Sequence, residues 1–65
     1  MRSVQRTEVG RLERHHVWLF LRTDAGHHWR LDMDERRATG LVGLRVEVNG
    51  SVKNGTITVD GIVPA

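Results

Sequence analysis

Three aromatic residues lie close together in the stretch HHVWLFLRTDAGHHWRLD, which covers residues 15–32. Trp18, Phe20 and Trp29 are the only Phe, Tyr or Trp residues of the chain, and Arg22 and Arg30 fall among them. Aromatic rings on which bases stack, interleaved with arginines for phosphates, are typical of sequence-tolerant single-strand binding. These residue types therefore indicate a ligand surface, provided that rings and arginines share one exposed face.

Which residues share a face depends on the loop between the two halves of this stretch. Asp24-Ala25-Gly26 predicts a three-residue hairpin loop with Gly26 in the left-handed conformation. This loop sets Leu21 opposite Trp29 and Phe20 opposite Arg30. A two-residue loop would scramble the two faces and would require a positive φ at Ala25.

The three-residue loop gives the predicted hairpin two distinct faces. One face is apolar and is expected to cover the core: Val17, Leu19, Leu21, Trp29, Leu31 and Met33. The other face mixes rings and charges: Trp18, Phe20, Arg22, His28, Arg30 and Asp32. Trp29 is therefore expected to be a core residue, whereas Trp18 is expected to lie outside.

The segments on either side of the hairpin predict one strand and one short helix. Residues 7–14 are typical of a strand, with Gly10 as a bulge or bend. After the hairpin, Asp34 is suited to cap a helix that continues as far as Val42. Because Gly40 weakens this helix by up to about 1 kcal/mol, we expect only one or two turns.

Two further strands are predicted in the last third of the chain. Residues 44–49 alternate apolar and polar side chains, and Asn54-Gly55 is a strong hairpin signal before a fifth strand that contains Ile57. Ile62 has the wrong parity for that strand, so we expect a bulge or bend at Asp60-Gly61. The predicted core comprises Leu12, Leu19, Leu21, Trp29, Leu31, Leu41, Leu44, Val46, Val48, Ile57 and Val59.

Length and composition indicate one small domain over residues 1–65, with residues 1–6 as a flexible tail. The chain has no cysteine, and its ten basic residues, nine of them arginine, exceed the acidic residues by only two. A genome rich in G and C would also produce this arginine bias. No stretch has the length of a signal peptide core or a membrane span, so we expect a cytoplasmic protein without a membrane partner.

The order of elements, with a helix between the third and fourth strands, resembles the OB (oligonucleotide/oligosaccharide-binding) fold. More narrowly, the chain resembles small uncharacterised bacterial OB-type domains. The segments that carry this resemblance are Gly10-Arg11-Leu12, Thr23-Asp24-Ala25-Gly26, Trp29-Arg30-Leu31, 41–50 and 57–63. The resemblance implies an all-β, five-stranded OB-like Greek-key barrel with a short helix between strands 3 and 4. An SH3-like barrel is the alternative, but its helical turn usually precedes the last strand.

The resemblance also implies where a ligand would bind. In OB folds the usual ligand surface is the outer face of strands 2 and 3, flanked by two loops. Here that face would hold Trp18, Phe20, Arg22, His28 and Arg30, approached by Arg14, His15 and His16 from one loop and by Lys53 from the other. We expect weak, low-specificity binding of single-stranded nucleic acid there. The alternative is a protein-interaction or homodimerisation module that uses the same face.

The remaining polar residues do not predict a metal site or catalysis. The pair His15-His16 and the pair His27-His28 are expected to lie roughly 20 Å apart along the hairpin, too far to share one zinc ion. The chain has no cysteine, only two serines, no glycine-rich phosphate loop and no paired carboxylates where a cleft is expected. We therefore expect neither an enzyme nor a bound cofactor.

Overall fold

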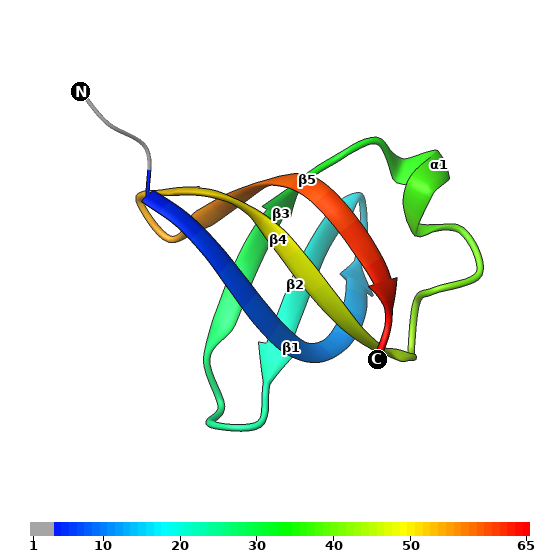
Figure 1. The fold of residues 1–65 in the computed structure, drawn as a ribbon. Coiled ribbons are helices and arrows are strands. Elements are labelled where there is room, and N and C mark those ends of the chain that lie inside the picture. The colour runs from blue at the N-terminus through cyan, green and yellow to red at the C-terminus, as the bar shows by residue number, and fades with distance from the viewer. Residues whose placement is uncertain (1–3) are drawn as a thin grey trace.

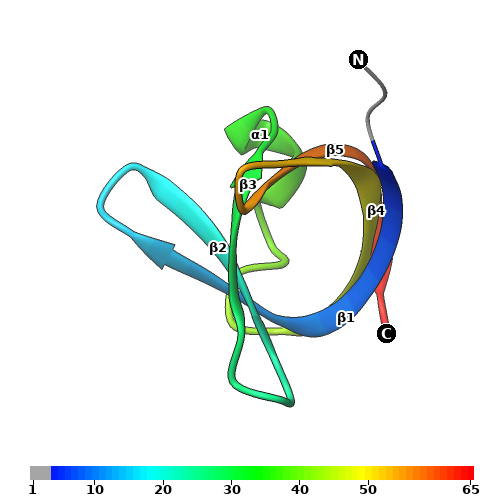
Figure 2. The ribbon, with the colours of Figure 1, turned by 90° about the vertical axis from the view of Figure 1, so that its left-hand side faces the viewer.

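Five strands form a closed ring in the computed structural model, which describes residues 4–65 (Figures 1 and 2). The elements in chain order are β1 (Val4–His15), β2 (Trp18–Thr23), β3 (His28–Asp32), α1 (Glu35–Ala38), β4 (Arg45–Lys53) and β5 (Thr56–Pro64). Around the barrel the order is β1-β2-β3-β5-β4, and β4 pairs with β1. Only the pairing of β3 with β5 is parallel. The predicted all-β, five-stranded barrel with a helix between strands 3 and 4 is therefore confirmed.

The β2–β3 hairpin has the predicted register. Leu21 is paired with Trp29, and Phe20 is paired with Arg30. The loop closes through a hydrogen bond from the amide of Gly26 to the carbonyl of Thr23, 2.9 Å long, and Gly26 has a φ of 88°. The apolar side chains of both strands consequently face the barrel interior, and Trp18 lies outside.

The first part of strand β1 pairs with β4 and its second part pairs with β2, and Gly10 takes part in both pairings. Gly10 is paired with Val46 of β4 on one side and with Thr23 of β2 on the other. A Cβ atom at this position would lie 2.3 Å from the carbonyl oxygen of Arg22, so only glycine fits. The register is continuous here, so Gly10 lies in a curved strand rather than in a bulge (Figure 2).

The helix is shorter than the longest extent predicted. Asp34 caps it as expected, because its carboxylate accepts a hydrogen bond from the amide of Arg36 at 2.9 Å. The helix ends at Ala38 rather than Val42, and Gly40 adopts a φ of 84°, which is incompatible with continuation. Ala38 is almost fully buried against the core, a contact that the sequence did not predict.

The core agrees with the prediction except at Leu44, and the expected place of Val17 on the core-covering face of the hairpin is also wrong, since Val17 lies in the β1–β2 turn and is 72% exposed. The buried residues are Leu12, Leu19, Leu21, Leu31, Ala38, Val46, Val48, Ile57 and Val59, and the partly buried residues packed on them are Trp29, Met33, Leu41, Val52 and Ile62. Leu44 is 48% exposed, so its predicted place in the core is wrong. It lies in the turn before β4. Its carbonyl accepts a hydrogen bond from the amide of Leu12, but its side chain lies outside the core.

The hairpin turn and the bulge predicted near the C-terminus are both confirmed. Asn54 and Gly55 have φ values of 52° and 75°, as the two central residues of a type I′ turn require. In β5, Gly61 is paired with Asn49 and Val59 with Gly50, so that Asp60 is the extra residue of a bulge. The bulge restores the inward parity of the strand after Val59.

Part of the predicted flexible tail instead forms regular structure. Residues 1–3 lie outside the described residues, but Val4, Gln5 and Arg6 begin β1 and are paired with β4. Within residues 4–65, the single helix is too short to cross a membrane.

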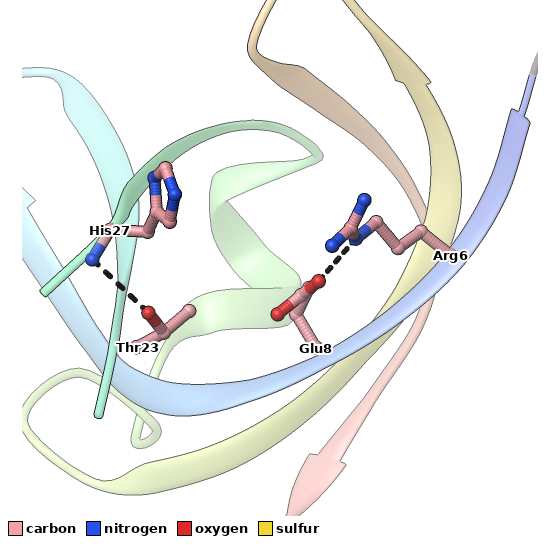
Figure 3. A network of polar contacts seen from close by, with 4 residues as sticks. All are labelled: Arg6, Glu8, Thr23 and His27. Carbon is pink, nitrogen blue, oxygen red and sulfur yellow. Dashed lines mark hydrogen bonds and ion pairs between the residues drawn. The ribbon is translucent and has the colours of Figure 1, made fainter. Parts of the chain in front are cut away.

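Trp29 is packed on the core and partly exposed. The guanidinium of Arg6 lies 5.2 Å from its ring centre, and the His27 ring lies 6.1 Å away. Figure 3 shows Arg6 with its ion-pair partner Glu8 on the β1 side, and Thr23 with His27 on the side of the β2–β3 hairpin. Trp29 is thus surrounded by polar groups at its edge, yet it belongs to the interior face as predicted.

Candidate nucleic-acid interface

The outer face of β2 and β3 carries an exposed indole that is stacked by an arginine. Trp18 is 47% exposed, and the Cζ atom of Arg30 lies 3.7 Å from the centre of its ring. Because Arg30 is paired with Phe20, two positions along β2 from Trp18, this contact runs diagonally between the strands. It is a cation–π interaction that holds a flat, charged group above the indole.

Phe20 continues the aromatic surface and is partly exposed. The ring of His15 meets it edge to face, with the ring centres 5.6 Å apart. His15 is paired with Trp18 across the β1–β2 hairpin, which places its side chain on this outer face. The aromatic surface therefore extends onto β1.

Glu13 introduces a negative charge beside Phe20, its partner on β2. Its carboxylate lies 3.4 Å from the Nε2 atom of His15 and 3.7 Å from a guanidinium nitrogen of Arg22. The hydrogen bond with His15, aided by the charge of Arg22, lowers the pKa of Glu13 below its usual value. Glu13 is therefore ionised at neutral pH, and it adds to this surface a carboxylate that the sequence did not predict there.

The other basic residues predicted for this face flank Arg30. Arg22 and His28 are paired and exposed at the end near the β2–β3 loop. Lys53 is paired with Thr56, which is itself paired with Arg30, so the β4–β5 hairpin brings Lys53 into the row that contains Arg30. The structure thus places Arg22, His28, Arg30 and Lys53 on the predicted surface.

Arg14 and His16 are not part of this surface. Arg14 is paired with the buried Leu19, which places its side chain on the opposite face, and it forms an ion pair with Glu35 of the helix. Its Nε atom also donates a hydrogen bond to the carbonyl of His16 at 3.1 Å. His16 occupies the tip of the β1–β2 hairpin with a φ of 58°. Of the three residues expected from the first loop, only His15 joins the face.

A shallow groove lies beside the stacked pair, with a volume of about 330 Å³. The residues that line it include Trp18, Arg30 and Met33, together with the acidic residues Asp32 and Glu35. Asp32, predicted on the same face as Trp18, lies in the same groove and would repel a phosphate there. The interface therefore combines stacking surfaces with charges of both signs, which limits its attraction for a polyanion.

The histidines do not gather into a metal site. Within the part of the chain that the structure describes, no three His, Asp or Glu side chains are arranged to hold a metal ion.

A closed five-stranded barrel with an exposed aromatic and arginine face defines the class of this protein. The chain belongs to a family described as "Protein of unknown function (DUF5818)", whose model matches residues 9–65. No curated protein and no solved structure matches it.

Proposed function

We propose that this protein binds single-stranded nucleic acid weakly and with little sequence preference. The interface is the outer face of β2 and β3. The observation that carries the proposal is the exposed Trp18 ring with Arg30 stacked on it. Bases splayed from a single strand stack on aromatic rings and on arginine guanidinium planes alike. Phe20, the next outward residue of β2, offers a second ring about 7 Å along the strand.

The barrel architecture supports the same placement. A five-stranded barrel whose helix lies between strands 3 and 4 resembles the OB fold, in which this face and the adjoining loops contact oligonucleotides. Arg22 and Lys53 flank the rings at positions where they would meet the phosphate backbone. A binding role fits these groups better than catalysis, because they are stacking and charge-pairing side chains. A bacterial origin and a cytoplasmic location remain predictions.

The acidic residues account for the expected weakness. Glu13 and Asp32 offset part of the charge of Arg22 and Arg30, and each would repel a phosphate placed above it. We therefore expect the backbone of the bound strand to follow the side of Arg22 and Lys53. Affinity should depend on stacking more than on charge, with a shallow salt dependence.

Tryptophan fluorescence during titration with oligothymidylate at low salt tests this proposal. Trp18 emission should be quenched, and Trp18→Ala should weaken binding about tenfold, since each stacked base contributes about 1–3 kcal/mol. Trp29→Phe is the matched control and should retain both affinity and quenching. An absence of quenching in the wild type, or equal loss in both variants, would refute the proposal.

A protein-interaction or homodimer interface on the same face is the second candidate. It is favoured by the joint exposure of Val17 and Trp18, at 72% and 47%, at one end of the β1–β2 hairpin. A partner that covers both would remove apolar area from water. This alternative predicts a dimeric mass in solution that Trp18→Asp converts to a monomer, without any added oligonucleotide.

A further inference from the structure

Three arginines stand side by side on the outer surface of β4, β1 and β2. Arg11 is paired with Arg45 on one side and with Arg22 on the other. All three are exposed, and Figure 2 shows β1 lying between the other two strands. Directly paired residues have Cβ atoms about 5 Å apart, and like charges in such positions are destabilising. A row of this kind is costly unless an anion lies above it.

The same three arginines line a pocket of about 510 Å³, together with Thr23 and Asp24. The Asp24 carboxylate accepts two hydrogen bonds from Arg45, at 2.9 and 2.8 Å, which fix the guanidinium plane. Arg22 reaches Glu13 only at 3.7 Å. Within residues 4–65, no carboxylate lies within ion-pair distance of Arg11.

The charge of the pocket indicates which anion it suits. Among the residues that line the pocket, three guanidinium groups against the carboxylate of Asp24 leave a net charge of +2, and Glu13, 3.7 Å from Arg22, offsets part of it from outside the lining. A phosphate monoester carries a charge of about −1.5 to −2 at neutral pH and has three acceptor oxygens. A phosphodiester within a nucleic-acid strand carries only one negative charge. Guanidinium groups bind phosphate oxygens in a bidentate manner, as Arg45 already does with a carboxylate.

We propose that Arg11, Arg22 and Arg45 form a binding site for a phosphate monoester group. The group is supplied either by the terminal phosphate of a nucleic-acid strand or by a small phosphorylated molecule. Arg11 makes the first contact because it has no carboxylate partner, and Asp24 competes with the ligand for Arg45. Arg22 is shared with the proposed nucleic-acid interface, but Arg11 and Arg45 lie outside it. The two sites can therefore be tested separately.

NMR detection of the arginine Nε–H resonances during titration with methyl phosphate tests this site. The resonances of Arg11, Arg22 and Arg45 should shift together, and dimethyl phosphate should bind several times more weakly. Arg11→Gln and Arg45→Gln should each weaken methyl phosphate binding by about threefold to tenfold. Asp24→Asn should strengthen it, because the competing carboxylate is gone. Arg36→Gln on the exposed helix is the matched control and should change nothing.

Three outcomes would overturn the assignment. They are the absence of shifts at the three arginines, equal binding of the monoester and the diester, and unchanged affinity in both Arg11→Gln and Arg45→Gln. The backbone amide resonances of each variant show whether it is folded.

Oligonucleotides with and without a 5′- or 3′-terminal phosphate identify the source of the group. Tighter binding of a phosphorylated strand, lost in Arg45→Gln, supports a strand end as the ligand. Methyl phosphate binding without this preference supports a small phosphorylated molecule. Trp18→Ala should leave methyl phosphate binding intact, so failure of the nucleic-acid proposal and failure of this one give different results.

Discussion

At the scale of single residues, the charged groups that each aromatic ring or arginine contacts determine which side chains are available to a ligand. Arg30 stacks on Trp18, whereas Arg14, a residue of the same type, forms an ion pair with Glu35 of the helix. Residue type therefore does not decide which arginine is available to a ligand. Strand parity decides it, and parity depends on the hairpin turns.

The contact between Arg30 and Trp18 should be measurable in the folded protein without any ligand. An exposed cation–π pair contributes about 0.5–1 kcal/mol, so Arg30→Gln should lower the free energy of unfolding by that amount. Urea denaturation measures this loss, and the emission of Trp18 should change at the same time. Arg36→Gln, whose side chain is 91% exposed, is the control. Equal stability of the two variants would contradict a stabilising stack.

The pair of Asp24 and Arg45 should make stability depend on pH in acid. The two hydrogen bonds from Arg45, together with its charge, lower the pKa of Asp24 below its usual 3.8. The pair therefore stabilises the folded state fully above pH 3.8, and this contribution is lost as the pH falls through the folded-state pKa. The difference in melting temperature between wild type and Asp24→Asn should shrink over that range. A difference as large in acid as at neutral pH would argue against this pair.

At the scale of elements, turns with a local signal were predictable, and one turn without such a signal was not. Gly26 and Asn54-Gly55 adopt the left-handed conformations that their residue types favour, so both hairpins have the expected register. The β1–β2 turn instead requires a positive φ at His16, and histidine adopts this conformation much less readily than glycine does. For this reason the sequence grouped Arg14 and His16 with the ligand face and left Glu13 out of it.

The two errors in the core have similar causes. Ala38 lies in the polar segment ERRA, where a single small side chain gives no apolar periodicity, yet the helix packs this residue on the barrel. Leu44 continues the alternation of Val46 and Val48, but β4 begins only at Arg45. Periodicity shows which face a strand buries, and it does not show where the strand enters the barrel.

Gly10, where β1 pairs with both β4 and β2, should tolerate substitution poorly. A Cβ atom would lie 2.3 Å from the Arg22 carbonyl, so Gly10→Ala must displace backbone and should cost about 1–3 kcal/mol or more. At Gly26 the added atom meets nothing within 4 Å, and Gly26→Ala should cost only the left-handed conformation, about 1 kcal/mol. Thermal and urea denaturation compare the two. A greater loss at Gly26 would contradict the close approach at Gly10.

At the scale of the whole molecule, closure of the barrel creates surfaces that no local pattern contains. Arg11 and Arg45 are far apart in the sequence and meet only because β1 pairs with β4. Alternation alone would mark both residues as outward-facing, but it carries no information on the register between distant strands. The aromatic face, by contrast, is formed mostly within one hairpin, and it was predictable for that reason.

The proposed interface depends on the two indoles having different environments within one small barrel. Trp18 is on the outer surface under Arg30, and Trp29 is packed on the core beside Arg6. A strand bound to the outer face of β2 and β3 should contact the first and leave the second in place. The two indole N–H groups therefore report separately on binding.

The most direct test is to follow both indole N–H resonances by NMR while a short single-stranded oligonucleotide is added at low salt. We expect the Trp18 resonance to shift progressively and saturably, with little change at Trp29. A Trp18 resonance that stays fixed, or shifts confined to Trp29, would contradict binding on this face.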